Sequence, residues 1–270
     1  MQKLTNKIAT TLTFTLFSLA AAGTKANAQS LPICPPTGTV ADLSSTAGPC
    51  RGTPDRYVVS IYEMGLCTTN PLSTGSFDPT SCHATFTSSG TSVNLAGGAT
   101  ISLGGSGGSG GTRPPDGKYP SAYIIIGNTF GLRGGYKLVG GGGGTVVYGS
   151  DSSGNAVAGG AATNFTETLT NFNPGGGCTP TAFENVGTGR LEALITDASL
   201  GAATSCSGVA RIIGAFSPTT PIMIDPATTG LEVTFSVTNN GMTLVDGGAP
   251  GFNLVEYQSG PFSPSFKILK

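Results

Sequence analysis

The chain has 270 residues, of which only 10% are charged, and its formal net charge at neutral pH is −1. The few charges are spread without blocks, which argues against nucleic acid or an anionic membrane surface as a partner, because both require clustered lysine and arginine. The chain is rich in glycine, with 43 residues, and contains no tryptophan. Short runs of valine, isoleucine, leucine and phenylalanine recur along it, which favours an all-β protein over a disordered one.

The first 28 residues are typical of a secretory signal peptide. Lys3 and Lys7 give a positive start, residues 8–22 are mostly apolar, and Ala26-Asn27-Ala28 is a small-x-small cleavage site. This apolar run is shorter than the roughly twenty residues of a membrane span. We therefore expect an exported protein, extracellular, at the cell surface or periplasmic, that begins at Gln29 and has no membrane span. Three basic residues leave with the peptide, so ten remain against 14 acidic residues, a net charge of −4.

All six cysteines follow the cleavage site, and an even number in an exported chain predicts three disulfides. Fifteen pairings are open to six cysteines, and sequence alone does not choose among them. We expect the sequential pairing, because each pair then encloses a loop rich in glycine, proline, threonine and serine. A zinc site is not expected, since no two cysteines have C-x2-C spacing and the chain has one histidine. The expected pairs are Cys34–Cys50, Cys67–Cys82 and Cys178–Cys206.

Residues 29–54 form a proline-rich leader, which we expect to be irregular and tied down by its own disulfide. The stretch Arg56–Cys67 follows, and its alternation of apolar, aromatic and polar residues predicts one β-strand. Residues 104–111 read Gly-Gly-Ser-Gly-Gly-Ser-Gly-Gly, the composition of a flexible linker. They either separate two subdomains near 104–112 or form a long loop of one domain. The turn signal at Pro114–Gly117 favours the loop.

Short strands are predicted in close order through the rest of the chain. The apolar centre of residues 119–132, Tyr123–Ile126, indicates burial on both faces. Asn164–Phe172 alternates like a half-exposed strand, whereas Gly189–Leu200 is equally compatible with a helix and a strand. Asn239-Asn240-Gly241 predicts a hairpin between strands at 230–237 and 242–245. We therefore expect residues 55–270 to form an antiparallel β-sandwich or jelly roll with long glycine-rich loops and three disulfides.

Chemical motifs are sparse. His83, in a polar loop, has no recognisable catalytic partner in the sequence. Asp151, Ser153 and Asn155 carry oxygen ligands at alternate positions, as calcium loops do, but lack the later bidentate glutamate, so a plain turn is the simpler interpretation. Glycoside hydrolysis needs only two carboxylates, and none of the acidic residues stands in a motif. The tyrosines could provide a sugar-binding face, although packing is their commoner use: Tyr57, Tyr62, Tyr119, Tyr123, Tyr136, Tyr148 and Tyr257.

Three segments together resemble a group of uncharacterised exported β-rich proteins of marine bacteria. They are the strand Arg56–Cys67, the loop between Cys67 and Cys82, and the segment Pro115–Gly135, PDGKYPSAYIIIGNTFGLRGG. In that group a Tyr-x-Val-x-Val strand ends in Leu-Cys, and a later Gly-x-Tyr segment leads to a strand ending in Thr-Phe and then Arg/Lys-Gly. The resemblance covers roughly the first half of the mature chain and carries no assigned function.

These observations lead us to expect a non-enzymatic extracellular or cell-surface protein with a structural or adhesive role, such as a subunit of a surface assembly. Its partners would be other copies of the chain or surface proteins, and the leader could add to a neighbouring sheet edge. Two alternatives stay open. One is a carbohydrate-binding module that holds a glycan on a tyrosine face, and the other is a carbohydrate-active hydrolase with a carboxylate pair. No cofactor is expected.

Overall fold

The computed structural model describes residues 31–34, 38–39, 48–103, 112–139, 145–173, 176–247 and 254–270. The predicted signal peptide, part of the leader and the glycine-rich stretch 104–111 lie outside these ranges. Within them the chain is all-β, as predicted, apart from one short 3-10 turn at Pro79–Ser81. No helix in the described part of the chain has the length and apolar character that crossing a membrane requires.

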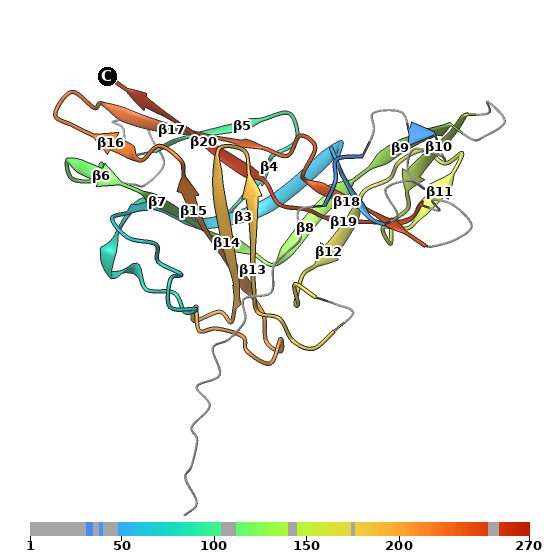
Figure 1. Cartoon of the computed structure of the whole chain (residues 1–270), viewed down its shortest axis with the longest axis horizontal. Helices are drawn as coiled ribbons and strands as arrows, with labels where there is room; N and C mark the ends of the chain where they lie inside the picture. Colours follow the sequence, from blue (N-terminus) through green and yellow to red (C-terminus); the bar gives the residue numbers. More distant parts are fainter. Residues whose placement is uncertain are drawn as a thin grey trace, which may run out of the picture.

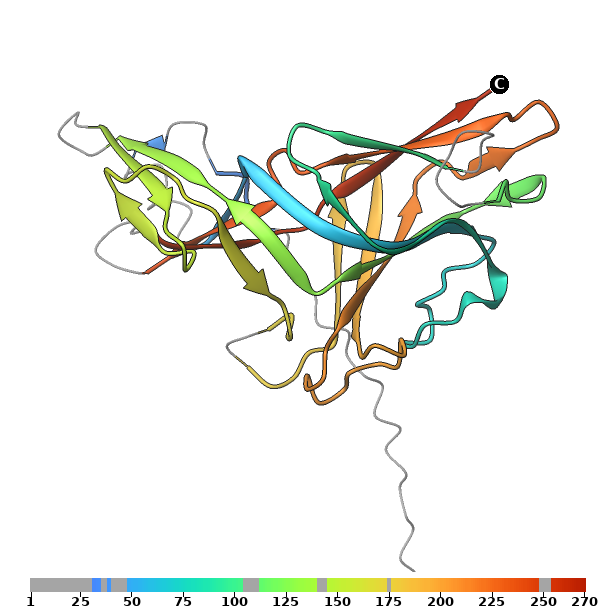
Figure 2. The same ribbon diagram turned by 180° about the vertical axis from the view of Figure 1, so that it is seen from behind.

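An eight-stranded antiparallel sheet is the centre of the fold (Figures 1 and 2). In it, β4 pairs along one side of β3, whereas β7 and then β8 pair along the other. Beyond them the sheet forks into a branch through β12 and a branch through β15, β14 and β13. Its strands are β3 (Arg56–Cys67), β4 (Cys82–Asn94), β7 (Ser121–Gly127), β8 (Thr129–Arg133), β12 (Phe165–Thr168), β13 (Thr181–Val186), β14 (Gly189–Thr196) and β15 (Arg211–Pro218).

The main sheet curls into a half-barrel and is not clearly the sandwich or jelly roll that strand density suggested. Smaller sheets surround it. They are β1 (Gly38–Thr39), β9 (Gly135–Val139), β10 (Thr145–Ser150) and β11 (Ala156–Ala158); β6 (Gly117–Tyr119) and β16 (Ile222–Ile224); β5 (Ala99–Leu103), β17 (Gly230–Ser236) and β20 (Ser263–Leu269); and β2 (Cys50–Gly52), β18 (Met242–Asp246) and β19 (Leu254–Ser259).

The three disulfides join the pairs that the sequence predicts, Cys34–Cys50, Cys67–Cys82 and Cys178–Cys206. Cys67 and Cys82 lie directly opposite each other where β3 and β4 pair. Three such bonds indicate an oxidising environment and therefore export. The described part of the leader pairs within its own chain, since β1 lies parallel to β9 and β2 lies antiparallel to β18.

Strand β7 lies in the core along its whole length. All seven of its residues are buried, as the prediction of burial on both faces requires. Ile124 and Ile126 belong to the large cluster on the concave side of the half-barrel. Tyr123 and Ile125 belong to a second cluster on the other face, where Leu72 of the loop between β3 and β4 covers them. Strands β5 and β6, on either side of residues 104–111, both contribute to the large cluster.

Two local predictions have different outcomes. Residues 189–196 form strand β14, so the strand alternative for that stretch is correct. The turn at residues 239–241 exists, and Asn239 adopts the expected left-handed backbone with a φ of 58°. The hairpin prediction is nevertheless wrong, because β17 pairs with β20 and β5, whereas β18 pairs with β19 and β2. A turn sequence indicates only that the chain reverses direction. Here the reversal leads from β17 in one sheet to β18 in another.

Candidate ligand-binding groove

The candidate site begins where the main sheet forks, between β7 and β8. Asn128 occupies this point and is 9% exposed. Its side-chain amide donates to the carbonyl oxygens of Leu169, at 3.3 Å, and Val209, at 3.2 Å. The backbone carbonyl of Asn128 accepts a hydrogen bond from the backbone N–H of Leu169 at 2.8 Å. Because Leu169 follows β12 and Val209 precedes β15, Asn128 holds the two branches together at their base.

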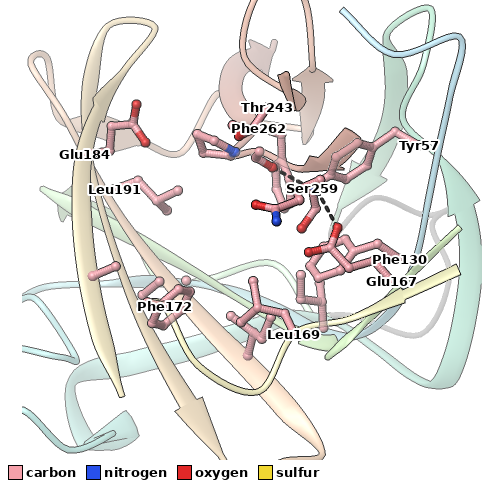
Figure 3. Close-up of a pocket in the computed structure, with 18 of the residues that line it drawn as sticks. Tyr57, Phe130, Glu167, Leu169, Phe172, Glu184, Leu191, Thr243, Ser259 and Phe262 are labelled. Carbon is pink, nitrogen blue, oxygen red and sulfur yellow. Dashed lines mark hydrogen bonds between the residues drawn. The ribbon is translucent and has the colours of Figure 1, made fainter. Parts of the chain in front are cut away.

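Above this fork, on the concave side of the half-barrel, lies a groove with a cavity volume of about 530 Å³ (Figure 3). This volume falls within the range of small-molecule sites. Its floor is apolar and comes from β7, β8, β14, β15 and the segment after β12. The floor side chains are Ile124, Ile126, Phe130, Leu169, Phe172, Leu191 and Ile212.

Small residues keep the groove open. Ala182, Ala193 and Gly214 lie side by side on β13, β14 and β15, and all three line the groove. A methyl group added at Gly214 would already lie 3.2 Å from a methyl carbon of Ile124 and 3.4 Å from one of Leu191. These three positions add little side-chain volume to the groove, and at Gly214 the neighbouring Ile124 and Leu191 side chains leave no room for more.

One wall of the groove carries a buried ion pair. The guanidinium of Arg51, on β2, lies 2.9 Å from the carboxylate of Glu184, on β13, and also donates to the hydroxyl of Thr243, on β18. The Arg51 and Glu184 side chains are 12% and 10% exposed. Burial raises the pKa of Glu184, and the charge of Arg51 opposes that shift. The pair links the leader to the edge of the main sheet and leaves no net charge on this wall.

A second carboxylate, that of Glu167 on β12, lies on the other side of the groove (Figure 3). The backbone N–H of Ser259, on β19, donates to it. Glu167 lies opposite Phe130 in the pairing of β12 with β8. Burial raises the pKa of Glu167, the nearby charge of Glu256 acts in the same direction, and the hydrogen bonds from Ser259 oppose both.

The tyrosines that the sequence offered as a sugar-binding face are mostly core residues. Tyr57 lines the groove but is 1% exposed, and its hydroxyl donates to the carbonyl of Gly260 at 2.6 Å. Burial raises its pKa far above the ordinary value. Tyr119, Tyr123 and Tyr257 are also buried. The ring of Tyr62 is covered by the guanidinium of Arg211, 3.7 Å from the ring centre.

The other sequence candidates lie away from the groove. His83 is exposed on β4, where its ring and that of Tyr119 form a T-shaped pair. Asp151 accepts hydrogen bonds from the backbone N–H groups of Ser153 and Asn155 and from the Asn155 side chain, which lower its pKa. Its oxygens therefore close a turn, as the simpler interpretation held. No three histidine, cysteine, aspartate or glutamate residues in the described ranges are grouped so as to hold a metal ion.

Sequence reasoning did not single out Arg51, Glu167 or Glu184. One signal was present for Glu167, since the alternation of residues 164–172 places it on the same side as Phe165 and Leu169. Glutamate is rarely buried without a partner, so a carboxylate on the apolar face of a strand is a candidate functional group. No protein-family model matches the chain, and no curated protein or solved structure has significant similarity to it. The geometry of the groove is thus the basis for assigning a function.

Proposed function

We propose that the chain is an exported, non-enzymatic binding protein whose groove takes a small molecule with a mainly apolar body. The observation that carries this proposal is the cavity of about 530 Å³ with an aliphatic and aromatic floor. Contact between such a floor and an apolar ligand removes apolar surface from water on both sides, which favours binding by about 25 cal/mol per Å². Ala182, Ala193 and Gly214 provide the room for that ligand.

The groove favours this function over a role in carbohydrate chemistry. Glu167 and Glu184 line the same groove, but Glu184 is committed to Arg51 by an ion pair. Tyr57 has no exposed ring face on which a sugar would stack. The floor is built from side chains that cannot hydrogen-bond sugar hydroxyls. A structural or adhesive role has less support, because the described leader strands pair within their own chain.

A fluorescence titration tests the proposal. N-phenyl-1-naphthylamine, a neutral apolar probe that brightens in apolar surroundings, is titrated into the purified mature protein. We expect saturable binding, and we expect Ala193→Leu to weaken it at least about tenfold, because the added side chain occupies the cavity and removes buried contact. Ala158→Leu, on the exposed strand β11, is the matched control and should keep the wild-type affinity.

The melting temperature of each variant shows whether it is folded. If Ala193→Leu does not fold, Ala182→Leu fills the same space from the edge strand β13. A probe that does not bind to the wild-type protein would overturn the proposal. Equal affinity in the wild-type protein and a folded cavity-filled variant would overturn it as well.

A further inference from the structure

The groove is lined by one more acidic than basic side chain. Among the described residues that line it, three are charged: Arg51, Glu167 and Glu184. Arg51 and Glu184 neutralise each other at a distance of 2.9 Å. The charge of Glu167 is left over, so the groove with all three groups ionised carries one net negative charge at its polar side.

The side chain of Glu167 is held at the edge of the cavity, where a ligand in the groove would contact it. Its carboxylate accepts the backbone N–H of Ser259, which holds β12 against β19. In Figure 3 the two residues meet at the edge of the cavity, with Phe130 beside them and Leu169 below. A carboxylate among such groups has lost part of its hydration, and an opposite charge is the partner that compensates best for this loss.

We propose that the natural ligand is an amphiphile whose protonated amine binds the Glu167 carboxylate while its apolar chain lies along the floor. This inference rests on the proposed function, of which it specifies the ligand class. An anionic head group would meet the unpaired charge of Glu167. The two terminal nitrogens of Arg51 already bind Thr243 and Glu184, and the remaining Nε, which has no hydrogen-bond partner among the described residues, is buried. A neutral alcohol would make the same chain contacts with the floor, but its hydroxyl would form a weaker hydrogen bond to Glu167 than an ammonium group does.

The pH dependence of binding follows from the surroundings of Glu167. The titratable and charged groups around it are Glu256 on β19, Tyr57 on β3 and, beyond Tyr57, Arg51 on β2. Burial raises the pKa of Glu167, so its carboxylate takes up a proton at a higher pH than an ordinary glutamate. Amine binding should therefore weaken as the pH falls through that raised pKa, while the binding of a neutral probe stays constant.

Competition experiments at neutral pH test the inference. Decylamine, decanol and decanoate, which share one chain length, are used to displace N-phenyl-1-naphthylamine. We expect decylamine to displace it at about tenfold lower concentration than decanol, with decanoate the weakest, since a hydrogen bond between two charged groups is stronger than one from a neutral hydroxyl. Glu167→Gln should remove the preference for the amine, measured as the ratio of the decylamine and decanol concentrations that displace the probe. Glu232→Gln, on β17 outside the groove, makes the same charge change and should keep the preference.

The outcomes separate the two proposals. Probe binding with equal displacement by decylamine and decanol, or with decanoate as the best competitor, would overturn the amine inference and leave the apolar groove standing. If the probe does not bind to the wild-type protein at all, the proposed function itself is wrong. A Glu167→Gln protein that fails to fold does not stop the test, because the wild-type pH series measures the same carboxylate. An amine preference that stays unchanged from pH 8 to pH 4 would contradict the assignment to Glu167.

Discussion

Replacement of Asn128 by alanine tests whether the fork of the main sheet is held by one side chain. The substitution removes both amide hydrogen bonds, to Leu169 and Val209, and leaves two carbonyl oxygens without that donor. An unsatisfied buried polar group costs about 1–3 kcal/mol. Because Leu169 and Val209 are half-buried, water compensates in part, and we expect the free energy of unfolding to fall by about 2 kcal/mol in total.

Urea unfolding followed by far-UV circular dichroism measures this loss, since the chain has no tryptophan to report it by fluorescence. Asn164→Ala is the matched control, because Asn164 is exposed just before β12, and such a change is expected to stay within about 0.5 kcal/mol. The affinity of the groove for a neutral probe should also fall in Asn128→Ala, since the fork sets the position of Leu169. A change in stability no larger than that of the control would refute the idea that Asn128 holds the fork.

Two further predictions concern the stability of the sheet and its dependence on pH. Gly65→Ala should destabilise the protein by about 1–3 kcal/mol in the same unfolding assay, because a Cβ there would clash with the carbonyl oxygen of His83 and with the Tyr123 ring. Gly177→Ala, where an added Cβ has nothing within 4 Å, is the control and should change little. A carboxyl group whose pKa rises on folding binds its proton more tightly in the folded state, so its contribution to stability is complete below its ordinary pKa of 4.5 and is lost as the pH rises through the raised value. We therefore expect the wild-type free energy of unfolding to decline over that range and the decline to be shallower in Glu167→Gln; equal slopes would contradict the raised pKa.

Local sequence signals predicted the features that depend on neighbouring residues. The alternation of Arg56–Cys67 predicted a strand, and β3 has those bounds. Each disulfide closes a short segment, with sequence separations of 16, 15 and 28 residues, so sequential pairing could be predicted from loop composition. The apolar run Tyr123–Ile126 predicted burial on both faces, because such a run leaves no polar side to face water.

The features that the sequence did not predict depend on contacts between distant segments. The turn at Asn239–Gly241 was recognisable, but its two flanking strands do not pair with each other. Strand β17 pairs with β5 and β20, and β18 pairs with the distant β2 as well as with the neighbouring β19. The residues that line the groove also come together only through the pairing of distant strands. Glu167 lines it because β12 branches from β8 at Asn128, and Arg51 lines it because β2 joins the C-terminal strands. Strand alternation identifies which residues share a face, but it does not identify what that face meets.

The pairing of β2 with β18 also sets the order in which the groove can assemble. During synthesis Arg51 leaves the ribosome early, but its partner Thr243 lies 192 residues further along the chain. The floor, from β7 to β15, can form before that point, whereas the wall formed by β18 and β19 arrives only near the end. Until then the apolar floor faces its surroundings, as a surface that a chaperone would bind. A chain truncated after β15 should therefore aggregate, and ligand binding should begin only with the last strands.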